Sequence, residues 1–223
     1  NDFIMKKEIN LLKNYPVTKR NLQEASIQRT DEVRKVARKF DKEFFDGDRK
    51  YGYGGYSYNP RFWTTVVKDF IEYYNLVDGS KILDVGCGKG FMMYDFLQAN
   101  KNLIVKGIDI SKYAIENSMQ EIKDYVSVGN AKELNFDDNE FDLVISINTV
   151  HNLEYEECAR ALQEIERVSR KDKYVILDAY RDNEQKERML KWNLTAKTIL
   201  NVDDWIELFN KYGYTGDYYW FTP

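Results

Sequence analysis

The sequence predicts an α/β fold in which helices cover both faces of a doubly wound, mostly parallel sheet. From Lys81 onward, short apolar segments alternate with longer segments of helical periodicity, a pattern typical of strand–helix–strand units. The apolar segments show little polar alternation, as expected for strands that are buried on both faces. The predicted strands are residues 82–85, 103–108, 126–128, 143–147 and 174–177.

Helices are predicted between and after these strands, and one further strand follows the last helix. Gly213 follows the last helical segment, and the apolar and aromatic residues beyond it favour a strand. The predicted helices are residues 91–99, 112–120, 155–169 and 202–212, and the last strand is 217–222.

The first part of the chain is predicted to form a helical arm and a lid (residues 1–59) that precede a domain of residues 60–223. Thr30 or Asp31 can cap a helix with apolar residues on one face. A Gly/Tyr loop at residues 51–58 suits neither a regular helix nor a packed strand, and Asn59 and Pro60 are typical of a helix start. The predicted helices of this part are residues 6–13, 30–44 and 60–75.

Composition limits the classes of function. A chain of 223 residues is long enough for one sizeable domain, and its net charge of −4 argues against nucleic acid and anionic lipid as partners. No apolar run approaches the length of a membrane span, which is about 20 residues. Two cysteines and one histidine provide neither a disulfide framework nor a zinc cage, so no metal is expected and a reducing, cytoplasmic setting fits best. The oligomeric state is not predicted.

The sharpest motif is a strand that runs into three glycines at alternate positions, followed at once by a helix. Gly86, Gly88 and Gly90 allow a tight turn and a close approach of a ligand, and the helix N-terminus favours an anionic group. The dinucleotide fingerprint would need glycine at position 91, where Phe91 stands, and no P-loop motif occurs. A glycine turn without a ligand is the plain alternative.

An acidic residue ends the second predicted strand. Asp109 follows Gly90 by about twenty positions, where a carboxylate can accept hydrogen bonds from both hydroxyls of a ribose. A lone aspartate at this place is often only a helix cap, but Ser111 could already cap the next helix. The pairing of Asp109 with the glycine loop therefore favours a ribose site.

In this order and spacing, the motifs resemble those of the class I S-adenosylmethionine (SAM)-dependent methyltransferases, over about residues 60–180. Residues 82–90 resemble the first motif of that family, 107–111 its acidic motif and 129–134 its adenine-contacting motif. Residues 141–153 resemble its fourth strand and the loop beyond it. The resemblance implies a Rossmann-like fold, which normally closes with an antiparallel strand pair. Only residues 217–222 are a good candidate for that pair, so a strand is also expected near 195–201, unless the chain is truncated.

The resemblance further implies SAM as the cofactor. The three glycines would lie against its methionine moiety, Asp109 would hold the ribose, and Asn130 with Ala131 would border the adenine. Family members commonly carry aspartate where this chain has Asn130, whose amide oxygen can still meet the adenine amino group. The predicted cofactor-binding residues are Asp84, Gly86, Cys87, Gly88, Gly90, Asp109, Ile110, Asn130, Ala131 and Asn148.

The catalytic prediction concerns His151, the only histidine of the chain. Methyl transfer needs the acceptor lone pair aimed at the methyl carbon, and an oxygen acceptor usually also loses a proton. The resemblance places His151 on the loop that faces the methyl group, so it is predicted as the general base and oxygen is favoured over nitrogen as the acceptor. Related enzymes often show His-His there, whereas this chain has His151-Asn152, and a structural role is the alternative.

Contacts to the acceptor are predicted from the Gly/Tyr lid and from the loops after the strands. Tyrosines with Arg49 and Lys50 nearby suit a polar acceptor that carries phosphate or sugar groups. Lys19 and Arg20 could also reach a phosphate, although a solvated charge pair is the plain alternative. The predicted acceptor-binding residues are Tyr51, Tyr53, Tyr56, Tyr58, Arg61, Asn152, Tyr180 and Arg181.

Together these features predict methyl transfer from SAM to a small-molecule acceptor, foremost O-methylation of a sugar, nucleotide-linked or phosphate-type precursor. The lid also resembles, more weakly, that of bacterial methyltransferases of surface-polysaccharide decoration. An RNA methyltransferase and a non-catalytic SAM-binding subunit are the alternatives. The chain lacks the proline motif that adenine amino-group methyltransferases carry after the fourth strand, and this disfavours the first alternative. An NAD-dependent oxidoreductase is disfavoured by Phe91.

Overall fold

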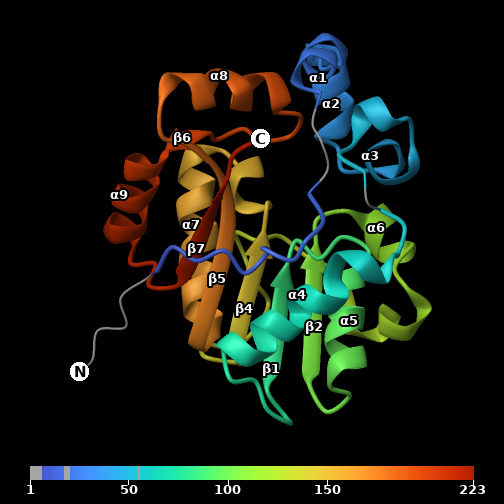
Figure 1. Cartoon of the computed structure of the whole chain (residues 1–223). Coiled ribbons are helices and arrows are strands. Elements are labelled where there is room, and N and C mark those ends of the chain that lie inside the picture. Colours follow the sequence, from blue (N-terminus) through green and yellow to red (C-terminus); the bar gives the residue numbers. More distant parts are fainter. Residues whose placement is uncertain (1–6, 18–20, 55) are drawn as a thin grey trace.

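The computed structural model describes residues 7–17, 21–54 and 56–223, and their centre is one sheet of parallel strands (Figure 1). The strand order is β3-β2-β1-β4-β5-β6, and β7 also pairs with β5. Every strand pairing of this sheet is parallel, so the carboxyl ends of the strands lie at one edge. The strands are β1 (Lys81–Val85), β2 (Ile104–Asp109), β3 (Val126–Val128), β4 (Phe141–Ile147), β5 (Ser169–Tyr180), β6 (Leu200–Asn201) and β7 (Asp217–Phe221).

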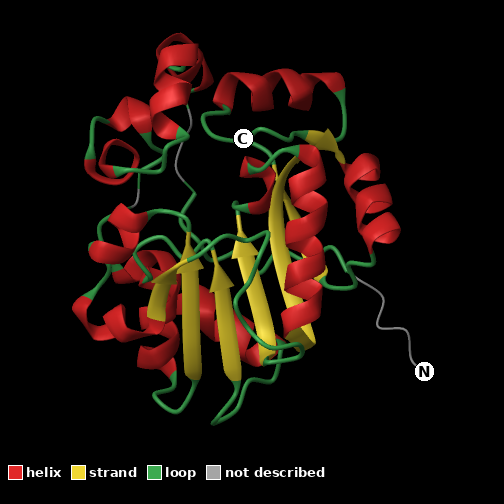
Figure 2. Cartoon of the chain, turned by 180° about the vertical axis from the view of Figure 1, so that it is seen from behind, coloured by secondary structure: helices red, strands yellow, loops and turns green. Residues whose placement is uncertain are grey.

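Helices cover both faces of the sheet (Figures 1 and 2). The helices α4 (Pro60–Tyr73) and α5 (Phe91–Ala99) bury apolar residues such as Phe70 and Phe96 on one face. On the other face, α7 (Tyr155–Val168) and α9 (Val202–Tyr212) bury residues such as Leu162 and Trp205. The predicted doubly wound α/β fold is therefore confirmed.

Most predicted elements are confirmed within a few residues of their bounds. The predicted helices 91–99 and 202–212 coincide with α5 and α9. Asn59 caps α4 through a hydrogen bond that its side chain accepts from the backbone N–H of Arg61, as predicted for this helix start. The predicted helix 112–120 is too long, because α6 (Lys112–Glu116) ends early and a short 3-10 helix, η2 (Gln120–Tyr125), follows it.

The expected antiparallel closing pair is wrong, because β7 runs parallel to β5. After β6, which lies in the stretch 195–201 and also pairs in parallel with β5, α9 returns the chain across the sheet. Gly213 ends α9 in the left-handed conformation (φ 75°). The chain thus enters β7 from the same end of the sheet as it enters β5.

The predicted helix at residues 6–13 is wrong for residues 7–13, and Lys6 lies outside the described residues. Instead, Glu8 forms a parallel bridge with Tyr218 at the edge of β7. The backbone N–H of Ile9 donates to Tyr218 O (2.9 Å), and that of Tyr218 donates to Lys7 O (3.0 Å). An open strand edge offers unpaired backbone groups, so pairing there overrides the weak helical pattern of this segment.

Four short elements precede α4, and with α8 they lie above the carboxyl ends of the strands (Figure 1). The predicted helix 30–44 is split, because the chain leaves the helix after Ala37 and Phe40 adopts a left-handed φ of 50°. Thr30 caps the first half through a hydrogen bond from the backbone N–H of Val33, as predicted. These elements are α1 (Leu22–Gln28), α2 (Asp31–Ala37), α3 (Lys42–Asp46) and the 3-10 helix η1 (Arg49–Tyr51), and α8 is Asn183–Trp192.

Candidate active site

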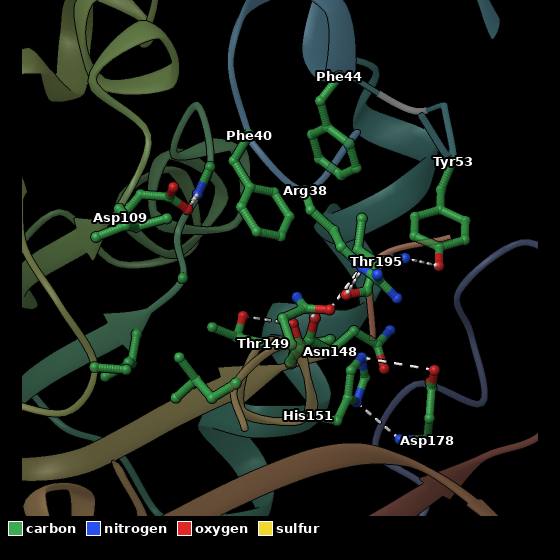
Figure 3. A pocket seen from close by; sticks show the side chains of 18 of the residues that line it. Arg38, Phe40, Phe44, Tyr53, Asp109, Asn148, Thr149, His151, Asp178 and Thr195 are labelled. Carbon is green, nitrogen blue, oxygen red and sulfur yellow. Dashed lines mark hydrogen bonds and ion pairs between the residues drawn. The ribbon is translucent and has the colours of Figure 1, made fainter. Parts of the chain in front are cut away.

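A cavity of about 520 Å³ lies between the carboxyl ends of the strands and the N-terminal lid (Figure 3). Its floor consists of the loops that follow β1, β2 and β4, together with the end of β5. Its roof contains Phe40, Phe44, Phe45, Tyr53 and Tyr56 from the lid. Ligands of parallel α/β sheets bind at this edge, and the volume is that of a small-molecule site.

The glycine loop turns sharply at the end of β1. Gly86, Gly88 and Gly90 all have positive φ, at 88°, 54° and 80°. A Cβ atom at Gly86 would lie 2.0 Å from Thr149 Oγ1 on the loop after β4. Only glycine therefore allows this turn and this close approach of the two loops. Gly86 and Gly88 line the cavity, whereas Gly90 lies outside its lining and caps α5.

Asp109 lies at the end of β2 with both carboxylate oxygens oriented by backbone donors. Oδ2 accepts from the N–H of Gly88 and Oδ1 from that of Ser111, each at 2.8 Å. A carboxylate oxygen can accept more than one hydrogen bond, so both oxygens keep capacity for a ribose hydroxyl. Burial raises the pKa of Asp109, and these two hydrogen bonds oppose the rise.

Asp84 and Cys87 line a second, smaller cavity of about 180 Å³, which shares Gly86 and Gly88 with the first. Burial, and then the neighbouring charge of Asp109, raise the pKa of Asp84 to about 7. Burial also raises the pKa of the Cys87 thiol well above its usual range, and the two carboxylates add to this effect. Cys87 is therefore a lining residue and not a nucleophile.

Asn130, Ala131 and Ile110 border the cavity on the side of β2 and β3. Asn130 Oδ1 accepts from the N–H of Lys132 at 3.1 Å, and its amide nitrogen has no hydrogen-bond partner in the part of the chain that the structure describes. Ile110 presents an apolar side chain that is 55% exposed. A polar amide beside an apolar surface fits the edge and the face of an adenine ring.

His151 lies on a short 3-10 helix after β4, η3 (Val150–Asn152), and contacts the end of β5. Its Nδ1 accepts a hydrogen bond from the backbone N–H of Asp178 at 2.9 Å, and its Nε2 lies 3.7 Å from Asp178 Oδ2 (Figure 3). Burial lowers the pKa of His151 and raises that of Asp178, and the attraction between the two groups opposes both shifts. The imidazole is therefore neutral, with its proton on Nε2.

The lid is fastened to the loop after α8 beside this pair. Arg38 donates to Thr195 O (3.3 Å) and Ala196 O (3.1 Å). The hydroxyl of Tyr53 accepts from the N–H groups of Leu194 and Thr195, at 2.8 and 3.2 Å. Thr195 Oγ1 donates to Asn152 Oδ1 (2.8 Å), which connects this loop to η3. These contacts form a polar wall of the cavity beside η3 and the end of β5, and this part of the cavity is called the acceptor half below.

The structure brings some of the predicted acceptor-binding residues together and places others elsewhere. Tyr53, Tyr56 and Asn152 line the cavity, as does the predicted cofactor-binding residue Asn148. The others lie outside the lining of both cavities, so their predicted role gains no support from their position. They are Tyr51, Tyr58, Arg61, Tyr180 and Arg181.

These side chains have other contacts. The hydroxyl of Tyr58 donates to Asp95 (2.8 Å), and the guanidinium of Arg61 lies over the ring of Phe62. Arg181 pairs with Glu8 at 2.7 Å. In addition, Lys50 lies over the ring of Tyr51, and Lys186 over that of Tyr180. Lys19 and Arg20 lie outside the described residues.

Several residues that line the cavity were not predicted from the sequence. Asp178 directly follows the predicted strand 174–177, at the edge where the other site residues lie, so its position was a usable signal. No comparable signal marks the residues of the lid and of the loop after α8, because only the tertiary fold brings them to the sheet. They are Arg38, Phe40, Phe44, Phe45, Trp192 and Thr195.

Comparison with known proteins assigns the central part of the chain to a family. A family model described as a methyltransferase domain matches residues 83–177, from β1 to β5. These residues form a methyltransferase domain of the class I SAM-dependent type. The fold of the chain is similar to that of the YcgJ protein from Bacillus subtilis, with a TM-score of 0.54 and 17% identity, covering 66% of each chain. It is also similar to a SAM-dependent methyltransferase from Methanosarcina mazei, with a TM-score of 0.50 and 22% identity, covering 64% of this chain and 82% of the other.

Two curated relatives match part of the methyltransferase. Phosphoethanolamine N-methyltransferase 1 from Arabidopsis thaliana is 34% identical over 93 residues, which are 39% of this chain and 18% of the relative. Phosphoethanolamine N-methyltransferase from Triticum aestivum is 29% identical over 92 residues, with the same shares. The matched part is thus about a fifth of the length of these relatives.

SAM is the cofactor of this methyltransferase domain, and the residues of the site fit it. Asp109 keeps hydrogen-bond capacity for the ribose, Asn130 and Ile110 suit the adenine, and the carboxyl group of Asp84 suits the ammonium of the methionine moiety. The described residues contain no group of three or more acidic, histidine or cysteine side chains that could hold a metal ion. None of their helices is both long and apolar enough to cross a bilayer.

Proposed function

We propose that this methyltransferase transfers the methyl group of SAM to the nitrogen of a small aminoalkyl phosphate. The observation that supports it is the arrangement of opposite charges in the acceptor half of the cavity. Arg38 and Arg49 line it from the lid, and Asp178 lines it from the end of β5. A zwitterionic acceptor, with phosphate at one end and an ammonium at the other, matches both charges.

The two guanidinium groups keep their charge available for an anion. Arg38 donates to the main-chain carbonyls of Thr195 and Ala196, and Arg49 donates to that of Gly52. These carbonyls orient the side chains but do not neutralise them. Within the described ranges, neither arginine has a carboxylate partner. A phosphate is a ligand that guanidinium groups recognise well, through paired and charge-assisted hydrogen bonds.

The nitrogen acceptor is supported by Asp178 and by the two curated relatives. A buried carboxylate attracts an ammonium group and holds its nitrogen near the loop after β4. The names of both relatives describe N-methylation of phosphoethanolamine, which is a small aminoalkyl phosphate. The sequence prediction of O-methylation rested on His151 as a free base, whereas its Nδ1 accepts a hydrogen bond from Asp178. O-methylation, a polysaccharide precursor as acceptor and a cytoplasmic location stay predictions.

The test compares acceptors at saturating SAM. Ethanolamine phosphate carries both charges, ethanolamine lacks the phosphate, and glycerol phosphate and a nucleotide-sugar offer hydroxyl groups. We expect turnover with ethanolamine phosphate and a kcat/KM at least about a hundredfold lower for ethanolamine, because the phosphate contacts are lost. Transfer to a hydroxyl group, identified by the methyl shift in NMR spectra of the product, would refute the proposal. SAM binding without turnover on any acceptor would instead favour a non-catalytic subunit.

A pair of lid variants tests the phosphate contact. We expect Arg38→Met to raise the KM for ethanolamine phosphate by about 10- to 100-fold, the usual effect of losing a charged hydrogen bond, with SAM affinity unchanged. Arg34→Met is the matched control. Arg34 lies on α2, which Arg38 directly follows, and it donates to the same loop, at Asn193 O, but it lies outside the cavity lining. Equal KM effects in the two variants would contradict a phosphate contact at Arg38.

A further inference from the structure

We propose that Asp178 is the proton acceptor of the reaction and that His151 is a residue that positions it. This assignment deepens the proposed function and rests on it, since it concerns the ammonium group of the acceptor. It differs from the prediction that His151 is the general base. Three observations carry it: the hydrogen bond at His151 Nδ1, the fixed backbone of Asp178, and the absence, within the described ranges, of a cation that pairs with its carboxylate.

The lone pair of His151 is already used. The last residue pair between β4 and β5 is Ile147 with Ile176. Asp178 lies two residues further along β5, so its backbone extends beyond the end of β4. His151 takes the place of the missing strand, and its Nδ1 accepts the N–H of Asp178 at 2.9 Å. A neutral imidazole has one acceptor nitrogen and one N–H group. With Nδ1 occupied, Nε2 carries the proton and has no lone pair for a substrate proton.

The carboxylate of Asp178 is held by a backbone that is fixed on both sides. Its N–H group donates to His151, and its carbonyl oxygen accepts from Trp205 Nε1 at 3.0 Å. Its side chain is 6% exposed and lines the cavity. Burial raises the pKa of Asp178, which makes the carboxylate a stronger base than one in water. The group is therefore both oriented and able to hold a proton.

Among the residues that the structure describes, no cation pairs with this carboxylate. The titratable groups that face it are His151 from η3 and Tyr53 from the lid. Trp205 from α9, Phe221 from β7 and Thr195 from the loop after α8 contribute no charge, and Lys197 of the same loop pairs with Glu154 at 3.2 Å. An ammonium group of the acceptor would supply the missing counter-charge, in the half of the cavity where the methyl group is transferred.

The proton and the electron pairs balance in a simple sequence. The acceptor ammonium gives one proton to the Asp178 carboxylate, which leaves a lone pair on nitrogen. That lone pair attacks the methyl carbon of SAM, the carbon–sulfur bond breaks, and its electron pair stays on sulfur. The products are S-adenosylhomocysteine and a methylated ammonium. The proton on Asp178 then passes to water as the products leave. His151 takes part only by holding the backbone of Asp178.

The tautomer of His151 is the first test, and it needs no substrate. Because the chain has a single histidine, ¹⁵N NMR of the imidazole reports this residue without overlap. We expect the tautomer with the proton on Nε2 between pH 6 and pH 8. A proton on Nδ1 would mean that the hydrogen bond from Asp178 is absent, and it would overturn the assignment.

Two variants separate the roles. In His151→Asn, the amide oxygen can still accept the Asp178 N–H, whereas no imidazole remains. We expect this variant to keep turnover within about tenfold, and Asp178→Asn to lose about a hundredfold or more in kcat, the usual contribution of a general base. Asp172→Asn is the control, since Asp172 also lies on β5 but pairs with Lys171 at the surface. Melting temperature and SAM affinity show that each variant is folded.

A reversed order, with His151→Asn losing more turnover than Asp178→Asn, would overturn the assignment. The pH dependence of kcat in His151→Asn decides the question even if Asp178→Asn does not fold. That variant contains no histidine, so an acidic limb that survives in it does not come from an imidazole, and loss of the limb would overturn the proposal. Absence of turnover in the unaltered chain refutes the proposed function, whereas full turnover in a folded Asp178→Asn variant refutes only the role of Asp178.

Discussion

Asp84→Asn is the substitution whose effect can be worked out most directly from the structure. The pKa of Asp84 rises from 3.8 to about 7 in the folded chain, first because of burial and then because of the charge of Asp109. An increase of that size corresponds to about 4 kcal/mol, at about 1.4 kcal/mol per pKa unit. At pH values between 3.8 and about 7, the carboxyl group of Asp84 is protonated in the folded chain and ionised in the unfolded chain. The free energy of unfolding therefore falls as the pH rises through this range. The loss is complete above about pH 7.

The variant lacks this ionisation, so its stability relative to the unaltered chain should increase with pH. We expect the difference in the free energy of unfolding to grow by about 3 kcal/mol between pH 5 and pH 8. The burial of the new amide contributes equally at every pH and does not alter this trend. Urea denaturation without cofactor measures the difference, provided that the m-values of the two proteins agree.

The control is Asp124→Asn, because Asp124 is exposed on η2 and surface substitutions change stability by less than about 0.5 kcal/mol. A difference for Asp84→Asn that stays constant from pH 5 to pH 8 would refute the reasoning. The same variant should bind SAM at least about tenfold more weakly, because an amide cannot attract the ammonium of the methionine moiety as a carboxylate does. Calorimetric titration measures that loss.

Three further predictions concern the cofactor loop and the lid. Asp109→Ala should weaken SAM binding by about tenfold or more, because the ribose loses two acceptors, while circular dichroism shows an intact fold. Gly86→Ala should lower the free energy of unfolding by at least about 2 kcal/mol in urea titrations, because its Cβ would lie 2.0 Å from Thr149 Oγ1 at a φ of 88°. Lys89→Met should make the lid more sensitive to limited proteolysis, because Lys89 Nζ contacts both carboxylate oxygens of Asp46 on α3, at 2.7 and 2.8 Å. Equal proteolysis rates would show that this ion pair does not hold the lid.

The core of the fold could be predicted from the sequence because its elements bury regular patterns. The strands β1 and β4 and the second half of β5 contain apolar runs, and α7 repeats apolar residues at helical spacing. The helices α1 and α8 could not be predicted in this way, because each buries a single residue, Ala25 or Met189. Their helical state depends on mutual packing and on caps such as Asn21 and Asp182.

The end of the sheet shows why an expectation drawn from a family is weaker than one drawn from a pattern. The strand at 217–221 has aromatic residues at successive positions, and this pattern predicts its existence but not its direction. The direction depends on where α9 and the turn at Gly213 return the chain. The segment at Lys7–Ile9 completes the edge through backbone hydrogen bonds to Tyr218, which side-chain patterns do not encode.

In the two halves of the site, the residues that contact each other are separated by very different numbers of positions in the sequence. This difference explains why the sequence predicts the cofactor half better than the acceptor half. In the cofactor half, Gly88 and Asp109 are 21 positions apart, and their hydrogen bond belongs to one strand–helix–strand unit. In the acceptor half, Arg38 and Thr195 are 157 positions apart, and Tyr53 and Leu194 are 141 apart. A local motif can encode the first kind of contact, because the turn and the strand fix its geometry. The second kind arises only when the lid packs over the finished sheet, so the chemistry of the acceptor has to be deduced from the folded structure.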